Sequence, residues 1–303
     1  MTDILIVGSI DVETGGIAQY IKGQINYLDN NIRTHDLAVS EGSGAMWLLQ
    51  GILVSVANCF RYMIKQPPDI VHIHTSHGFS FFRASFYVLF SKYIWRIPVV
   101  LHIHGSSFDN FVDTNNNIHI WYQNIVFHSS CRIIVLSTYW ENVLSDRVQK
   151  SKVEVIPNAV DTSKYEPHTT STPHVVFVSN LINRKGVSEL VKAVQQLENR
   201  DIPDYRLTIA GRGPLSGSVA QLSAEFDHIE YRGFVSEEEK RKIINSGTIY
   251  VLPSHAEGLP IAILEGMAGG NAIISTTVGS IPEVITSENG ITIPPKSADQ
   301  LEE

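Results

Sequence analysis

The stretch Tyr250–Val278, YVLPSHAEGLPIAILEGMAGGNAIISTTV, decides the fold that we expect for this chain. Tyr250–Leu252 has the apolar, β-type composition of a short buried strand, and a polar loop follows it. After the loop, the apolar residues Ile261, Leu264 and Ala268 recur at the spacing of one face of a helix. The stretch therefore predicts a strand, a loop and a helix in the order that α/β proteins use.

Two carboxylates border the start of this helix. Pro260 suits the first helical position, because its missing N–H would have no partner there. Glu257 then lies in the loop and Glu265 in the second helical turn. Backbone N–H groups at this helix end, with Gly258 allowing close approach, would form a pocket for an anion such as a phosphate. Carboxylates beside such a pocket suggest recognition of sugar hydroxyls, although solvated surface glutamates are the common alternative.

The same letters resemble a known family. E-x(7)-E, opening as EGLP and followed by an apolar helix and AIISTTVGSIPEVI, resembles the donor-site motif of the retaining glycosyltransferases of family 4. The resemblance implies the GT-B fold, an α/β architecture of two Rossmann-like domains facing a central cleft. It also implies that Glu257 contacts hydroxyls of the transferred sugar and Glu265 the nucleotide ribose. Gly258, Leu259 and Pro260 are then expected at the donor.

Length and composition fit a two-domain globular protein. The 303 residues include 18% charged and 43% hydrophobic residues, with a formal net charge of -8. This charge argues against a nucleic-acid partner, which usually meets a basic surface. Only Cys59 and Cys131 are present, so neither a disulfide framework nor a thiolate metal site is expected. Without a signal-peptide pattern at the N-terminus, we expect a cytoplasmic location, with the inner face of the membrane as an alternative.

Two long apolar stretches carry polar interruptions. Met46 to Ile64 includes Gln50 and Arg61, and Phe79 to Ile97 includes Lys92. Neither is the unbroken run of about 20 apolar residues that a membrane-spanning helix needs. We expect both to be helices packed on a sheet. The aromatic and basic content of the second stretch leaves peripheral membrane contact open.

The chain begins with a buried strand, Ile4 to Gly8, followed by a loop with Gly15 and Gly16 and then a helical pattern. A strand, a glycine pair and a helix N-terminus together make a phosphate-facing turn. A lone glycine pair also serves any tight turn. In family 4 the corresponding loop lies beside the donor diphosphate, which implies donor contacts for both glycines.

Two strands end in HIH triplets, which contain His72, His74, His102 and His104. Alternation along a strand places each pair on one face. Four histidines allow a metal interpretation, but no thiolate or obvious carboxylate ligand accompanies them, so we expect no metal and treat the first three as core residues. His104 is different, because it follows the carboxyl end of its strand, where ligands bind in open α/β sheets. The family resemblance of its HxHG element implies contact with the donor sugar.

Arg184 and Lys185 stand immediately before Gly186 and a helical pattern. The N-terminus of a helix is the positive end of its dipole, so cations there are unfavourable unless an anion lies between them and the helix. A diphosphate would supply that anion. The segment resembles the GRL-xxx-KG element of family 4, in which the arginine and the lysine contact phosphates. Lys185 matches the lysine, whereas Asn180 replaces the arginine, and Arg184 is the candidate to compensate for it. A solvated pair of loop cations is the alternative.

The segment RLTIAGRGPLSG, Arg206 to Gly217, predicts a strand followed by a glycine-rich loop. Its G-x-G-x-x-x-G spacing misses the dinucleotide fingerprint by one residue, and Glu230 lies near the place of a ribose-binding acid, so a dehydrogenase is a rival interpretation. By resemblance to family 4, Gly211 lines the nucleobase pocket. Val235, in GFVS, borders the base in the same way.

The resemblance implies a crossing between domains at VIPNAVD. We expect an N-terminal, acceptor-side domain over residues 1–160 and a C-terminal, nucleotide-sugar-binding domain over 161–303. Family members continue past the last residues, NGITIPPKSADQLEE, through further helices, so the second domain is expected to be incomplete or truncated.

These residues together predict a glycosyltransferase. Glu257, His104 and Lys185 are the expected catalytic residues. The donor is a nucleotide diphosphate sugar of the UDP or GDP type, and the acceptor a glycan or a lipid-linked glycan. The sequence has no D-x-D, so we expect no cofactor and no divalent cation. Retention of anomeric configuration is implied by the family. A GT-B sugar-nucleotide epimerase and a catalytically impaired, truncated relic are the alternatives.

Overall fold

The computed structural model describes residues 2–10, 16–28, 31–37, 45–168, 172–200 and 204–303. The chain divides into two compact units, Met1–Pro157 (unit 1) and Asn158–Glu303 (unit 2). The predicted Gly15 lies outside the described residues.

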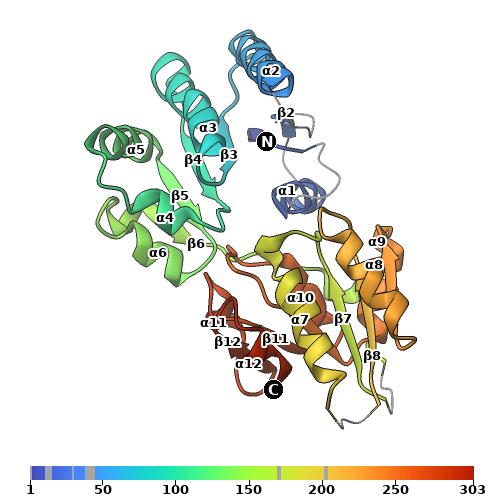
Figure 1. The fold of residues 1–303 in the computed structure, drawn as a ribbon. Helices are drawn as coiled ribbons and strands as arrows, with labels where there is room; N and C mark the ends of the chain where they lie inside the picture. Colours follow the sequence, from blue (N-terminus) through green and yellow to red (C-terminus); the bar gives the residue numbers. More distant parts are fainter. Residues whose placement is uncertain (1, 11–15, 29–30, 38–44, 169–171, 201–203) are drawn as a thin grey trace. The chain divides into compact units, whose positions relative to one another are not determined.

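In unit 1, the described residues form a parallel sheet of six strands in the order β2-β1-β3-β4-β5-β6 (Figure 1). The strands are β1 (Asp3–Gly8), β2 (Asn31–Asp36), β3 (Ile70–Thr75), β4 (Val99–Ile103), β5 (Arg132–Val135) and β6 (Val153–Val155). The helices are α1 (Gly16–Tyr27), α2 (Ala45–Met63), α3 (Phe79–Phe90), α4 (Phe108–Val112), α5 (Asn117–Ser129) and α6 (Thr138–Leu144), with short turns at η1 (Ser91–Trp95) and η2 (Lys150–Lys152).

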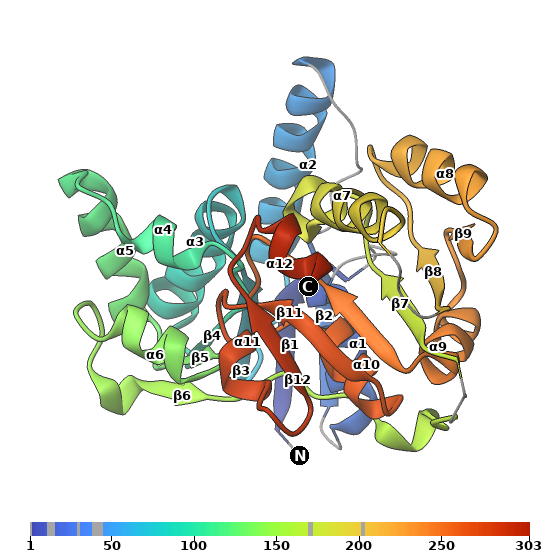
Figure 2. The same cartoon turned by 60° about the horizontal axis from the view of Figure 1, so that its bottom comes forward.

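In unit 2, a second parallel sheet of six strands has the order β12-β11-β10-β7-β8-β9 within the described ranges (Figure 2). Its strands are β7 (His174–Val178), β8 (Arg206–Ala210), β9 (Ile229–Gly233), β10 (Ile249–Leu252), β11 (Ala272–Thr276) and β12 (Gly290–Ile293). The helices are α7 (Val187–Leu197), α8 (Ser216–Glu225), α9 (Glu237–Ser246), α10 (Ile261–Ala268), α11 (Ile281–Val284) and α12 (Ala298–Glu302), with short turns at η3 (Thr162–Lys164) and η4 (Asn183–Lys185).

The cores follow from the parallel topology. Strands covered by helices on both faces are apolar along their whole length rather than at alternate residues. Leu5, Ile6 and Val7 on β1 are fully buried, as are Val176 and Phe177 on β7. These near-continuous apolar runs form the middle of each sheet, and the polar loops lie at the strand ends.

Unit 2 has the strand order of a doubly wound nucleotide-binding fold. The order reverses between β7 and β10, whose ladder is limited to the pairs Ile249–Val175 and Tyr250–Val176. Ligands of such sheets bind outside the carboxyl ends of the strands at this reversal. The loop that contains Glu257 follows β10, and the segment that contains Lys185 follows β7, so the topology brings these two segments to the same place.

Two sequence expectations are corrected here. Pro260 is not the first helical residue: it has an extended ψ of 121° and caps α10, which begins at Ile261. The stretch from Phe79 to Ile97 is not one regular helix, because α3 ends at Phe90 and a π-helical turn, η1, continues to Trp95. Among the described residues, no helix combines the length and the apolar character that crossing a bilayer requires.

Candidate active site

The carboxylate of Glu257 lies at the centre of a buried polar cluster in unit 2. Its side chain is 6% exposed, and its Oε1 accepts hydrogen bonds from Lys185 Nζ at 2.5 Å and from Ser254 Oγ at 2.7 Å. Its Oε2 is 3.8 Å from Arg184 Nη1. A buried carboxylate is stable only when it is paired and hydrogen-bonded, and Lys185 and Ser254 meet both conditions.

The backbone holds the two halves of this cluster together. The N–H of His255 donates to the carbonyl of Arg184 at 2.8 Å, and Arg184 Nη1 donates to the carbonyl of Ala256 at 2.9 Å. Gly186 has φ of +73°, and a Cβ at this position would lie 1.9 Å from the carbonyl oxygen of Pro253. Only glycine allows the turn before α7 to approach the loop after β10 so closely.

The loop from Ser254 to Pro260 is held from several sides. Thr276 Oγ1 donates to the carbonyl of Ser254 at 2.6 Å, Asn158 Nδ2 donates to the carbonyl of Leu259 at 2.6 Å, and the N–H of Ser280 donates to the carbonyl of Gly258 at 3.0 Å. Gly258, Leu259 and Pro260 are buried. These hydrogen bonds fix the conformation of the loop before any ligand binds.

Glu265 belongs to a second buried pair. It is 8% exposed, and Lys240 Nζ on α9 donates to its Oε1 at 2.7 Å. Burial alone would lower the pKa of the Lys240 ammonium, but the carboxylates of Glu265 and Glu237 raise it above its ordinary value. Burial, the charge of Glu265 and a hydrogen bond to Glu265 raise the pKa of the Tyr165 phenol. Glu265 is therefore a buried acceptor held by two side chains, Lys240 and Tyr165.

Tyr250 connects the two strands at the reversal. Its hydroxyl donates to the carbonyl of Val178 at 2.7 Å, and its ring is fully buried. Burial, followed by the charge of Glu265, holds the pKa of this hydroxyl well above its usual range. The tyrosine thus acts as a neutral donor that ties β10 to the carboxyl end of β7.

Four histidines form a stack at the carboxyl ends of β3 and β4 in unit 1. His74 Nδ1 is 2.9 Å from His104 Nε2, and the rings of His102 and His104 stack at 4.0 Å between centroids. The ring of Tyr20 on α1 packs against His104 at 4.9 Å. Burial lowers the pKa of His104 to about 3 and that of His72 to about 4. The stack is therefore neutral at physiological pH.

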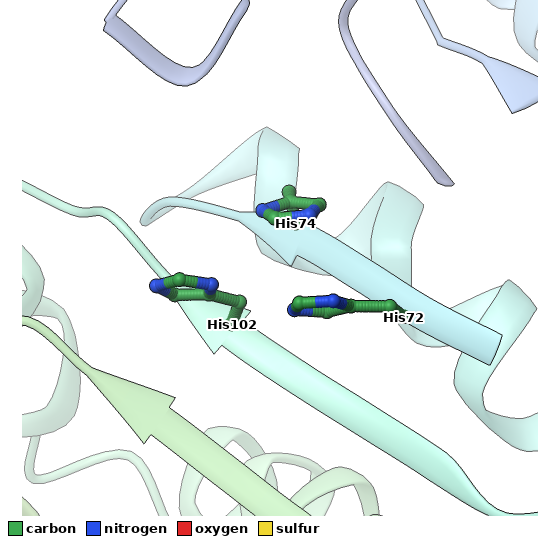
Figure 3. Close-up of side chains that lie close together, drawn as sticks. All are labelled: His72, His74 and His102. Atoms are coloured by element: carbon green, nitrogen blue, oxygen red, sulfur yellow. The ribbon is translucent and has the colours of Figure 1, made fainter. Parts of the chain in front are cut away.

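Three of these histidines are close enough to be considered as metal ligands. The ligand atoms of His72, His74 and His102 lie within 4.8 Å of one another (Figure 3). However, His72 and His74 stack face to face at 4.4 Å, and the planes of His72 and His102 differ by only 6°. These buried rings pack together as neutral imidazoles, because burial holds their pKa values below 6.5.

The chain matches two family profiles that together cover most of its length. One is described as Glycosyltransferase Family 4, over residues 15–164, and the other as Glycosyl transferases group 1, over residues 172–303. The chain belongs to the family 4-like glycosyltransferases.

Curated relatives agree with this assignment. The chain is 32% identical over 177 residues to a phosphatidylinositol N-acetylglucosaminyltransferase of Arabidopsis thaliana, a match that covers 56% of this chain and 39% of the relative. It is 28% identical over 213 residues to the GDP-mannose:cellobiosyl-diphosphopolyprenol alpha-mannosyltransferase of Xanthomonas oryzae, covering 67% and 54%. The chain thus spans about half the length of these relatives or less.

The fold agrees with a solved GT-B structure. Sucrose-phosphate synthase from Thermosynechococcus elongatus superposes with a TM-score of 0.74 at 18% identity, covering 100% of this chain and 88% of that chain. At this level of identity the similarity concerns the fold alone. The expected α/β fold class with two Rossmann-like sheets is confirmed.

The other residues expected at the donor in unit 2 lie in the loops after its strands. Asn180 follows β7. Gly211 follows β8 with φ of +144°, and a Cβ there would lie 1.8 Å from the Ser179 carbonyl oxygen. Val235, partly buried, lies between β9 and α9. In unit 1, Gly16 is the first residue of α1 and His104 directly follows β4.

The dehydrogenase interpretation loses its structural basis. A dinucleotide fingerprint follows the strand at the reversal of strand order, which is β7 in unit 2, whereas the glycine-rich loop of this chain follows β8. Glu230, the candidate ribose-binding acid, lies within β9 and pairs with Arg232 at 2.9 Å.

The structure adds residues that the sequence analysis missed, namely Ser254, Lys240 and Tyr165. A signal for Lys240 was present, because it shares a helical face with Ile243 and Ile244, which are buried in α9. A lysine on a buried face requires an anionic partner. Nothing in the sequence pattern identified Glu265 as that partner.

A large surface hollow lies elsewhere in unit 2. It measures about 810 Å³ and includes His174 and Arg206, which begin β7 and β8. These are the amino-terminal ends of the strands, whereas Glu257 and Lys185 follow the carboxyl ends. The size of this hollow therefore has no bearing on the candidate active site.

Proposed function

We propose that this protein transfers a glycosyl group from a nucleotide diphosphate sugar, of the UDP or GDP type, to a glycan or lipid-linked acceptor. The observation that carries the proposal is the buried cluster of Glu257, Lys185 and Ser254 at the reversal of strand order in unit 2. The name of the Xanthomonas relative, which includes both GDP-mannose and a diphosphopolyprenol acceptor, supports the same pairing of substrates.

In this proposal, Glu257 holds the transferred sugar. Lys185 and Ser254 both bond to Oε1, whereas Oε2 has only the more distant Arg184 guanidinium among the described cations. Oε2 can therefore accept hydrogen bonds from sugar hydroxyls. Glu265, held by Lys240, is suited to accept hydrogen bonds from ribose hydroxyls in the same way.

Lys185 and Arg184 would stabilise the leaving group. Negative charge grows on the departing diphosphate oxygen, and donors fixed in advance around it are the most effective form of catalysis available here. The Lys185 ammonium has three N–H donors, of which Glu257 takes one. We propose that these cations, with backbone N–H groups, perform the role that a divalent cation has in other transferases. We propose His104, neutral and hydrogen-bonded to His74, as a further residue that contacts the sugar.

The test combines binding with transfer. Thermal-shift measurements with UDP, GDP and NAD should show stabilisation by one of the diphosphates and none by NAD. Incubation of the matching nucleotide sugar with a polyprenyl-diphosphate glycan, in the presence of EDTA, should give a product of retained anomeric configuration by NMR. Conversion of the sugar nucleotide without acceptor would instead identify an epimerase.

A matched pair of variants tests whether the carboxylate of Glu257 is needed for transfer. Glu257→Gln should abolish transfer, because the amide cannot replace the charged acceptor that Lys185 and Ser254 hold. Glu288→Gln alters an exposed glutamate of the same unit and should transfer normally. Full transfer by Glu257→Gln would remove this residue from the mechanism.

A further inference from the structure

A carboxylate and an imidazole meet beside the Glu257 cluster in unit 2. Nε2 of His255 lies 3.0 Å from Oε2 of Glu189, and the two side chains are only 19% and 16% exposed. Both atoms are buried, and neither has another hydrogen-bond partner within the residues that the structure describes. A buried carboxylate oxygen without a donor is costly, so Nε2 carries the hydrogen that Oε2 accepts. His255 is therefore the donor in this contact.

The contact joins the two segments that carry the candidate catalytic residues. Glu189 lies in the first turn of α7, four residues after Lys185. His255 lies in the loop after β10, two residues before Glu257. The N–H of His255 also donates to the carbonyl of Arg184 at 2.8 Å. His255 thus holds the loop against the α7 segment twice, once through its backbone and once through its side chain.

The charges of the two segments leave Glu189 dependent on this histidine. An acid in the first turn of a helix is favoured by the helix dipole, which accounts for a carboxylate at this position. The nearby cation Lys185 is already bonded to Glu257. In the described part of the chain, Glu189 forms no ion pair with a lysine or an arginine. Loss of the imidazole would therefore leave the Glu189 carboxylate without its donor.

A displacement of His255 is transmitted directly to Glu257. Only Ala256 separates the two residues, and the carbonyl of Ala256 accepts a hydrogen bond from Arg184 Nη1 at 2.9 Å. A shift of the loop at His255 would therefore also disturb the Arg184 contact and move Glu257 relative to Lys185. Reaction rates are sensitive to such shifts, since a misplacement of about 1 Å can cost about 100-fold.

We propose that His255 and Glu189 are positioning residues for the transfer reaction. Their contact seats the loop after β10 on the first turn of α7, so that Glu257 and Lys185 keep the separation that the donor requires. The inference rests on the proposed function, because it assigns this contact a role at the same donor site. Neither residue touches the reacting atoms.

Two amide variants of His255 test the proposal through their reach. The side-chain nitrogen of glutamine can take the place of Nε2 as a donor, whereas asparagine is one methylene shorter and falls short of Glu189. His255→Gln should keep kcat within about threefold of wild type, while His255→Asn should lower kcat by about tenfold or more. The KM for the donor should change less than kcat, because Glu257 and Lys185 act most strongly as charge develops on the leaving group.

A second histidine–glutamate contact of unit 2 is the matched control. His228 Nε2 lies 3.0 Å from Glu198 Oε1, and His228 precedes β9 at the amino-terminal end of the strand, whereas Glu257 follows the carboxyl end of β10. His228→Asn removes the same kind of contact and should leave kcat near the wild-type value. Equal losses of kcat in the two asparagine variants would assign the His255 contact to general stability and overturn the proposal.

Removal of the acceptor completes the set. Glu189→Leu should lower kcat as much as His255→Asn, and the double variant should lose no more than either single variant, because both act through one contact. Losses that multiply in the double variant would contradict a shared role. Circular dichroism verifies that the variants fold, and since each single variant breaks the contact, either of them decides the matter if the other does not fold.

Crystal structures separate this proposal from the proposed function. In His255→Asn, Lys185 Nζ and Glu257 Oε1 should lie more than about 4 Å apart, beyond the reach of an ion pair. An unchanged Lys185–Glu257 contact in this variant would overturn the positioning role, whether or not the wild type transfers sugar. A displaced contact in the variant, together with a wild-type protein that transfers no sugar to any acceptor, would instead refute the proposed function.

Discussion

At the scale of single residues, the pairing of Glu257 with Lys185 is the decisive feature. The two side chains are 72 residues apart in sequence, 6% and 13% exposed, and joined by a 2.5 Å hydrogen bond. An ion pair this deeply buried gives little net stability, because desolvation offsets much of the attraction. In the proposed reaction, the pair would instead hold a carboxylate and a cation side by side at the donor.

This arrangement predicts the effect of removing the cation. Lys185→Met should lower kcat by about 100-fold or more, because it deletes a fixed donor at the leaving group. It should also destabilise unit 2 by about 3 kcal/mol, since Glu257 is left buried without its partner. Steady-state kinetics and urea unfolding measure the two effects separately.

The control for this prediction lies on the neighbouring helix. Lys192→Met alters a lysine of α7 whose side chain is 63% exposed and whose partner, Asp299, is 3.6 Å away. Both kcat and stability should remain near the wild-type values. Equal losses in the two variants would show that the cluster around Glu257 has no special role.

At the scale of elements, close backbone contact positions the site. The turn before α7 meets the loop after β10 only because Gly186 has no Cβ. The connections between β7 and α7 (residues 179–186) and between β10 and α10 (residues 253–260) meet where Gly186 approaches Pro253, so a shift of either would separate Lys185 from Glu257. The precision of the site therefore depends on two backbones rather than on the side chains alone.

Gly186→Ala should displace this contact. The substitution forces a residue with a Cβ into the left-handed region and into the Pro253 carbonyl, so we expect a loss of more than about 1 kcal/mol and a weaker affinity for nucleotide. Gly217→Ala is the matched control, because a Cβ in α8 at that position meets no atom within 4 Å; it should be neutral or stabilise by up to about 1 kcal/mol. Urea unfolding, followed by far-UV circular dichroism, measures the stability of both variants. Equal stability of the two variants would refute this explanation.

At the scale of the whole molecule, the two units should respond differently to pH. Unit 1 buries His72 and His104 with pKa values lowered by burial to about 4 and about 3, and the pKa values of His74 and His102 lie well below 6.5 for the same reason. In the unfolded chain these groups titrate near 6.5. Below that pH the unfolded state binds protons that the folded state cannot accept.

The stability of unit 1 should therefore be fully present above pH 6.5 and fall as the pH drops towards 4, by about 1.4 kcal/mol per pH unit for each histidine that stays neutral. All four tryptophans, Trp47, Trp95, Trp121 and Trp140, belong to this unit, so their fluorescence in urea reports its unfolding alone. His102→Leu should reduce the slope of the unfolding free energy against pH by the equivalent of about one bound proton. A stability of unit 1 that does not change between pH 7 and pH 5 would contradict the prediction.

The sequence alone predicted the α/β class and the strand–loop–helix at Glu257, because apolar periodicity and glycines act over a few residues. The capping of α9 is equally local: Ser236 accepts a hydrogen bond from the Glu239 N–H at 3.2 Å. The E-x(7)-E and HxHG motifs also indicated the family, since their letters lie within short segments.

Only the tertiary structure decided which distant groups meet and which faces are exposed. The pairs Lys185–Glu257 and Lys240–Glu265 depend on strand order, which local patterns do not encode. The apolar period of α2 predicted a helix with an apolar face, but a period does not tell whether that face meets the core or the solvent. The contacts of Tyr62 with Ser91 and Trp95 settle its direction, because they bury the opposite side of the helix.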